Sequence, residues 1–206
     1  MADLKPIRII SEININSEQI ILAAVTINKF LRLVDASEFV SVDIHDLVDF
    51  NLFYIDGPDK QRVINGNAAV GYLFSQGHLE NNKFINFLLV KGLINIDINR
   101  QAGNVQGLAY YNELGIVAVG WEDNLFNKGR ELLGIMHELG HIYGVPSEQR
   151  LGEDWVKKFA RHCPNDCIMF YDLNKKMDKI GLLDKPFCDT CLEDLKNYFK
   201  DKKVKV

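Results

Sequence analysis

The sequence predicts an α/β fold (α+β in its arrangement) in which a twisted mixed sheet packs on helices. The chain begins with a strand, a helix and a second strand, and more strands follow before the most apolar helix. This order is typical of a sheet with helices packed on it. With 206 residues, of which 47% are hydrophobic, the chain is long enough to bury its own core as a single domain.

The elements follow from local patterns. Residues 7–13 contain a β-branched run that predicts the first strand. Apolar residues recur at helical spacing from 18 to 34, behind Ser17, which is a residue type that caps helices. The same criteria predict strands at 39–44, 84–90, 94–98, 108–112 and 116–119, a helix at 67–75, and turns at 56–59 and 113–115.

Charge and composition argue against several classes of function. The net charge of −4 is spread along the chain and leaves no basic footprint, so we expect no nucleic-acid partner. No apolar run approaches the ~20 residues needed to span a bilayer. The first residues lack the apolar core of a secretory signal, so we expect a cytoplasmic protein with no membrane partner. In such a reducing compartment, cysteines are more often metal ligands than disulfides.

The helix predicted at 127–143 is apolar on most sides, yet it carries His137, Glu138 and His141 in an H-E-x-x-H motif. Residues four apart lie on one helical face, so both imidazoles can reach one zinc ion at about 2.0–2.1 Å. The carboxylate of Glu138 could then act as general base toward a zinc-activated water. Two structural histidines in an ordinary core helix are the alternative. Gly134, about one turn before His137, would leave room for a substrate or allow close packing.

A catalytic zinc needs a third protein ligand. Gly144 and Pro146 end the helix just after the motif, so the ligand has to come from elsewhere. The chain has five histidines, and His45 and His78 lie far upstream. His162 remains as the candidate.

All four cysteines lie in two close pairs directly after this histidine. Cys163 and Cys167 form a C-x3-C pair, and Cys188 and Cys191 form a C-x2-C pair. Two such pairs are typical of a four-cysteine structural zinc site, which would hold a C-terminal part that has little core of its own. The alternatives are two disulfides or unpaired core thiols.

With these motifs in this order, the chain resembles the archaemetzincins, a metzincin family of zinc peptidases. The resemblance covers roughly residues 127–195 and is carried by His137, Glu138, His141, Gly144, His162, Cys163, Cys167, Met169, Cys188 and Cys191. It implies a metzincin-like catalytic domain over residues 1–206. Residues 1–144 would form an N-terminal subdomain ending in the active-site helix, and residues 145–206 a C-terminal subdomain.

The resemblance also implies roles for further parts of the chain. Met169 would form the Met-turn, a hydrophobic floor beneath the metal. Some other metzincins place a tyrosine at the position of Tyr171, where it touches the metal or stabilises the oxyanion; the alternative for Tyr171 is simple packing. Residues 116–120 would form the upper rim of the cleft, where an extended peptide adds to a strand edge. Two N-terminal helices would pack on the zinc helix, and a helix at 192–199 would complete the C-terminal part.

The chain departs from the family pattern in two places. His162 lies 18 residues after Gly144 (162 − 144), where the family has three, so fifteen residues are inserted within 145–161. The first cysteine pair is also one residue shorter. The inserted stretch reads as a short amphipathic helix with Trp155 and Phe159 inward. It leaves three carboxylates open as replacements for the third ligand: Glu148, Glu153 and Asp154.

The function expected from these motifs is that of a zinc metallopeptidase with two zinc ions, one catalytic and one structural, and a peptide or protein as substrate. A catalytically inactive zinc module that binds peptides or a protein partner is the first rival. A zinc deaminase is the second, but such enzymes need H-x-E and place their cysteines on the catalytic metal. The sequence reveals neither the substrate nor the oligomeric state.

Overall fold

A five-stranded sheet forms the centre of this computed structural model, which describes residues 4–56, 62–79, 83–98, 101–110, 113–119, 125–159, 161–170 and 184–203. The strand order is β2-β1-β5-β9-β8. The strands are β1 (Ile7–Glu12), β2 (Val42–Val48), β5 (Ile85–Val90), β8 (Gly107–Tyr110) and β9 (Leu114–Ala118). Four of them run parallel, and β8 pairs antiparallel with β9 at one edge. The predicted mixed sheet is therefore present.

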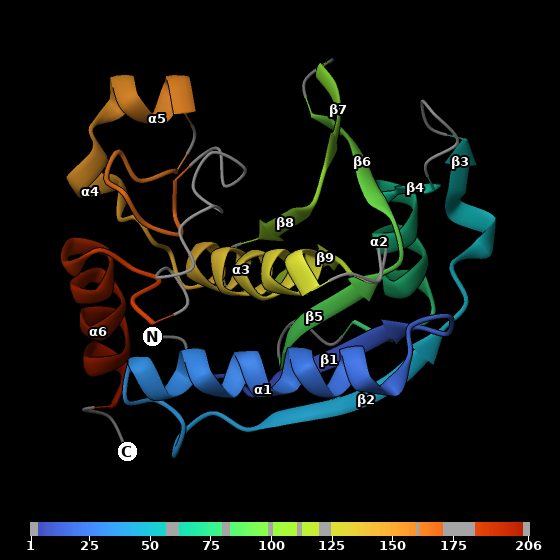
Figure 1. Ribbon diagram of the computed structural model, residues 1–206, viewed down its shortest axis with the longest axis horizontal. Helices are drawn as coiled ribbons and strands as arrows, with labels where there is room; N and C mark the ends of the chain where they lie inside the picture. The colour runs from blue at the N-terminus through green and yellow to red at the C-terminus, as the bar shows by residue number, and fades with distance from the viewer. Residues whose placement is uncertain are drawn as a thin grey trace.

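Helix α1 (Ser17–Leu33) connects the parallel strands β1 and β2 and covers one face of the sheet (Figure 1). Its cap differs from the prediction by one residue. The side chain of Asn16, not Ser17, accepts a hydrogen bond from the Gln19 backbone N–H at 2.9 Å, and the Gln19 side chain reaches back to Asn16. This reciprocal pair is a capping box, in which glutamine stands three residues after the cap.

A second sheet and helix cover the opposite face. Its strand order is β3-β4-β6-β7. It consists of β3 (Tyr54–Asp56), β4 (Arg62–Asn65), β6 (Leu93–Ile98) and β7 (Gln101–Val105), with helix α2 (Gly66–Ser75) and the short 3₁₀ helix η1 (Asn51–Phe53) beside it. The expectation that both N-terminal helices pack on the zinc helix was wrong. Leu73 of α2 belongs to the core on this far side, whereas α1, the other N-terminal helix, shares the core of the H-E-x-x-H helix.

Strand β2 begins three residues later than predicted. Phe39 lies in a turn and is half exposed, and the parallel register opposite Ile7 begins at Val42. Three short strands, β3, β4 and β7, were not predicted. The turn expected at 113–115 is also wrong in part, because β9 already begins at Leu114. The turn expected at 56–59 lies mostly outside the described residues.

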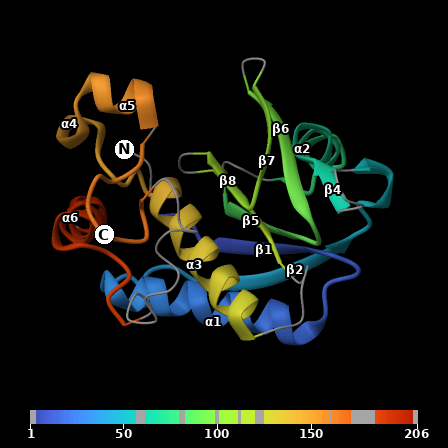
Figure 2. The ribbon, with the colours of Figure 1, turned by 45° about the horizontal axis from the view of Figure 1, so that its top comes forward.

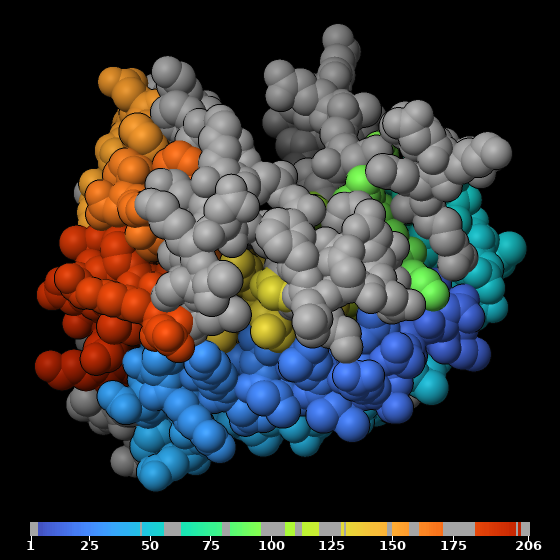
Figure 3. All heavy atoms as spheres, viewed as in Figure 1, coloured from blue at the N-terminus to red at the C-terminus, as the bar shows by residue number. Residues whose placement is uncertain are grey.

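Helix α3 (Leu125–Ile142) carries the H-E-x-x-H motif and packs between α1 and strands β8 and β9 (Figure 2). The chain then forms α4 (Glu148–Leu151), α5 (Glu153–Phe159) and, later, α6 (Asp189–Lys203). These three helices gather on one side of the molecule, away from the second sheet (Figure 3). Within the part of the chain that the structure describes, no helix has the length and apolarity needed to cross a membrane.

Candidate metal centres

The last two turns of α3 place two imidazoles side by side. His137 and His141 are four residues apart, and their Nε2 atoms are 3.0 Å from each other. His137 is only 7% exposed, and Ile135, Met136 and Leu139 around it on the helix are apolar and buried. The predicted shared helical face is therefore present, in an environment that would penalise two imidazoles without a common partner.

His162 joins this pair although the chain makes a long excursion to reach it. Its ring centroid lies 5.2 Å from that of His137 and 4.9 Å from that of His141. One ligating nitrogen from each of the three histidines falls within 4.8 Å of the others. Among the alternative ligands, Glu153 and Asp154 are exposed on α5 and lie outside this group. The side chain of Glu148 lies outside the described residues.

Hydrogen bonds to the backbone orient the two helical imidazoles. Nδ1 of His137 lies 2.7 Å from the carbonyl oxygen of Ile168. A carbonyl can only accept, so this nitrogen donates its proton and Nε2 keeps the lone pair that a metal needs. His141 is likewise bonded to the backbone of Val145. Histidines that bind a metal through one ring nitrogen usually form a hydrogen bond of this kind through the other.

Electrostatics keep these rings neutral. Burial lowers the pKa of His137 to about 4, although the hydrogen bond to Ile168 opposes the change. Burial also lowers the pKa of His141 well below its usual value, and repulsion from His137 and His162 adds to the effect. At neutral pH both imidazoles are therefore uncharged, which is the form that binds a metal ion.

The nitrogen spacing fits zinc. Two nitrogens at about 2.0–2.1 Å from a tetrahedral ion would lie roughly 3.3 Å apart. The observed separation of 3.0 Å between the Nε2 atoms of His137 and His141 is close to this value. Three imidazoles would leave the fourth tetrahedral position open, as in catalytic zinc sites.

Glu138 follows His137 directly in α3, and its carboxylate lies against the edge strand β8. A Cβ atom at position 107 would come within 2.3 Å of its Oε1, so only glycine allows the carboxylate to lie there. Glu138 is 6% exposed, and burial raises its pKa to about 8. A raised pKa in a carboxyl group close to a metal site is typical of a catalytic acid or base.

Met169 is completely buried and packs on α3. A Cβ atom at position 140 would lie 2.4 Å from its Sδ, so Gly140 provides the space for it. Phe187 also lies beside Gly140. Met169 therefore packs against the H-E-x-x-H segment of α3, and its expected role as the Met-turn beneath the metal stays a prediction. Tyr171 lies outside the described residues, so its expected role stays a prediction.

The four cysteines form a second cluster. The Sγ atoms of Cys163 and Cys188 are 3.8 Å apart, those of Cys167 and Cys191 are 3.9 Å apart, and all four lie within 4.8 Å of one another. A disulfide needs about 2.05 Å, so these thiols are unpaired. Four sulfurs at about 2.3 Å from a tetrahedral zinc would be separated by roughly 3.8 Å. The cluster therefore has the dimensions of a zinc site.

The thiols share hydrogen bonds with one another. Bonding to Cys167 and Cys191 lowers the pKa of Cys163, and bonding to Cys163 raises the pKa values of Cys167 and Cys191. The group therefore titrates as a unit, as expected of ligands that release their protons to a metal.

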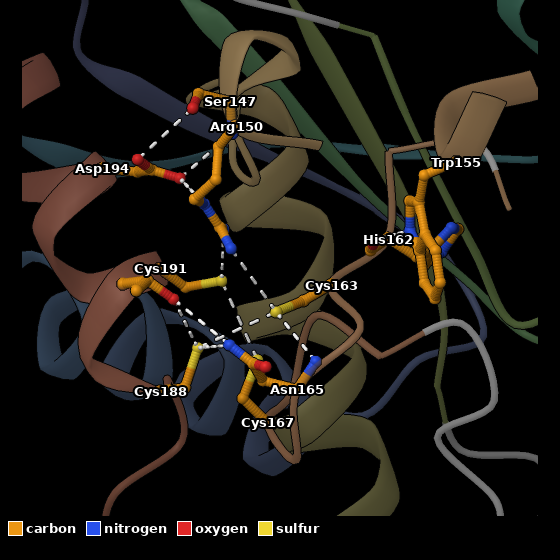
Figure 4. Close-up of polar contacts among 11 residues, drawn as sticks. Ser147, Arg150, Trp155, His162, Cys163, Asn165, Cys167, Cys188, Cys191 and Asp194 are labelled. Atoms are coloured by element: carbon orange, nitrogen blue, oxygen red, sulfur yellow. Dashed lines mark hydrogen bonds and ion pairs between the residues drawn. The ribbon is translucent and has the colours of Figure 1, made fainter. Parts of the chain in front are cut away.

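Donors around the sulfurs were not found from the sequence (Figure 4). The Asn165 backbone N–H lies 3.4 Å from Cys163 Sγ, and its side-chain amide lies 3.6 Å from Cys188 Sγ. The hydroxyl of Thr190 is 3.2 Å from Cys188 Sγ. Nη2 of Arg150 lies 3.1 Å from Cys191 Sγ. The available signal was that Asn165 lies within the first cysteine pair and Thr190 within the second.

Two expectations about the cleft were altered by the structure. The rim expected at residues 116–120 was wrong, because β9 is paired on both sides, with β5 and β8. The edge strand is β8, and no strand among the described residues pairs with its outer edge. A Cβ atom at position 134 would lie 3.6 Å from Val117 of β9, an ordinary contact distance, so this position faces the sheet and its packing does not require glycine.

Comparison with known proteins agrees with this architecture. No protein-family profile matches the chain, and no curated protein sequence is similar to it. Among solved structures, the archaemetzincin of Methanopyrus kandleri superposes with a TM-score of 0.58 at 17% sequence identity. The match covers 95% of this chain and 96% of the other. The chain therefore shares the archaemetzincin fold over nearly its whole length.

Proposed function

We propose that the protein is a zinc-dependent metallopeptidase. The observation that carries the proposal is the convergence of His137, His141 and His162, with Glu138 buried beside them on the same helix. A zinc ion held by the three imidazoles would supply a Lewis acid and activate water at neutral pH. The four-cysteine cluster would hold a second, structural zinc.

Residues of the chain would transfer the proton and bind the substrate. Glu138 would accept a proton from the attacking water and pass it to the leaving amine. A zinc dication nearby would favour the charged carboxylate, which is the form that can take up this proton. A peptide would bind in extended form along β8, whose outer edge offers main-chain hydrogen bonds directly beside Glu138. Tyr171 is the candidate for steadying the oxyanion. No nucleic-acid or membrane partner is proposed.

The test combines metal content with cleavage of unstructured peptides. Two zinc ions per chain are expected in the wild type. Glu138→Gln should retain both ions and lose about 100-fold or more in kcat/KM, the usual contribution of a general base. His162→Ala should retain one zinc and lose activity.

The same measurements distinguish a zinc peptidase from the alternative, a catalytically inactive zinc module. A wild type that binds two zinc ions but cleaves no peptide in a broad library would favour the catalytically inactive zinc module. In that case peptide binding, measured with the same library, would survive in Glu138→Gln.

A further inference from the structure

The inserted segment, residues 145–161, contacts both candidate metal centres. It comprises α4 and α5 and leads directly into His162. We propose that this segment is a brace, in which Trp155 positions the third imidazole ligand and Arg150 positions the cysteine cluster. The inference rests on the proposed zinc sites and concerns residues that belong to neither ligand set.

A long connection before a ligand carries an entropic cost. The family pattern has two residues between the glycine and the third histidine, whereas seventeen residues (145–161) separate Gly144 from His162. The entropy lost on closing a flexible connection grows with its length, and seventeen residues are many more than two. A passive excursion would therefore weaken metal binding, and an ordered one would restore it.

Trp155 provides one contact of the brace. Its indole Nε1–H donates to the backbone carbonyl of His162 at 2.7 Å, from helix α5 (Figure 4). Both residues are partly buried. The bond fixes the backbone of the residue whose ring completes the imidazole site, so Trp155 acts through His162 and not on the metal itself.

Arg150 provides the second contact. Its Nε–H donates to Asp194 Oδ2 at 3.0 Å, Nη2 donates to Cys191 Sγ at 3.1 Å, and Nη1 lies 3.9 Å from Cys163 Sγ. One planar guanidinium thus holds a carboxylate of α6 and two sulfurs together. Lysine, as a single point charge, cannot make these three contacts at once.

Asp194 ties the segment to α6 at a second position. It accepts hydrogen bonds from the Ser147 backbone N–H at 3.1 Å and from the Ser147 hydroxyl at 3.4 Å. The side chain of Arg150 is 23% exposed and that of Asp194 18%, so their ion pair is largely shielded from water. Both ends of α4 are therefore attached to α6.

The positive charge of Arg150 is favourable beside the cysteine cluster. Four thiolates overcompensate a bound dication, and the guanidinium beside two of them offsets the excess negative charge. Arginine stays protonated, so it supplies this charge whether or not the metal is bound. Outer groups of this kind typically change metal affinity 10- to 100-fold when they are removed.

The test is titration of the metal-free, full-length chain with Co²⁺. Absorption from thiolate-to-cobalt charge transfer reports the cysteine cluster, and binding without that band reports the imidazole site. We expect Trp155→Phe to weaken the imidazole site about 10-fold or more and to leave the charge-transfer titration unchanged. Arg150→Gln should weaken the charge-transfer step, and Arg150→Lys should rescue it only in part. Asp154→Asn, an exposed neighbour on α5, is the matched control.

Wild-type affinities in both Trp155→Phe and Arg150→Gln would overturn the brace. A wild type that binds no Co²⁺ at the imidazoles would instead overturn the proposed function. Should a variant fail to fold, hydrogen exchange of the wild type decides. By linkage, metal binding should protect the amides of α4 and α5, and unchanged protection would refute the coupling.

Discussion

Replacing Glu138 with glutamine should stabilise the metal-free protein at neutral pH. Burial raises the pKa of this carboxyl group from 4.5 to about 8. At pH 7 the unfolded chain has released the proton that the folded protein keeps. The interval between pH 4.5 and pH 7 corresponds to about 3 kcal/mol of lost stability, at about 1.36 kcal/mol per pH unit. A neutral glutamine of similar shape removes this penalty.

The sign of the effect fixes its pH dependence. A raised carboxyl pKa leaves stability intact below pH 4.5 and lowers it as pH rises toward 8. Urea unfolding of zinc-free wild type and Glu138→Gln should therefore differ by about 3 kcal/mol at pH 7 and converge near pH 4.5. Glu38→Gln, at an exposed turn, is the control and should match the wild type. Equal stabilities at pH 7, or a difference that grows as pH falls, would refute the reasoning.

Glycine positions provide three further predictions. Gly107→Ala places a Cβ 2.3 Å from Oε1 of Glu138, a flexible group, so the fold and zinc content should persist while kcat falls about 100-fold in a peptidase assay. Gly134→Ala meets only an ordinary contact and should raise the free energy of unfolding by about 0.5–1 kcal/mol through helix propensity. The Cβ atom of Gly140→Ala would lie 2.4 Å from Sδ of the buried Met169, so this variant should lower the free energy of unfolding by about 1–3 kcal/mol. Denaturant unfolding of the last two variants checks the contrast, and a stabilised Gly140→Ala would contradict the packing beneath the metal helix.

The candidate site was predictable where its chemistry is local. His137, Glu138 and His141 lie within one helix, so their common face follows from a spacing of four residues. The cysteine cluster was predictable because all four cysteines of the chain fall in two close pairs. These patterns needed no knowledge of how distant segments meet.

The rest depends on contacts that leave little trace in a single sequence. Which strand forms the edge depends on the order of strands in the sheet. The apolar β9 was therefore predicted as the rim, whereas the edge strand is the short β8. Likewise, Trp155 was expected to face inward, but its bond to His162 depends on how the inserted helices fold back. No motif in the sequence marks Arg150, and its contacts with Asp194 and Cys191 of α6 become visible only when the chain is folded.

His162 and Cys163 are consecutive residues that serve two different clusters. Consecutive Cα atoms are separated by about 3.8 Å, so this single peptide bond limits how far apart the two clusters can lie. One residue added between His162 and Cys163 would displace one of the two ligand sets. Variation in chain length should therefore be excluded within this dipeptide, even though the segment ahead of it is itself longer than in the family pattern.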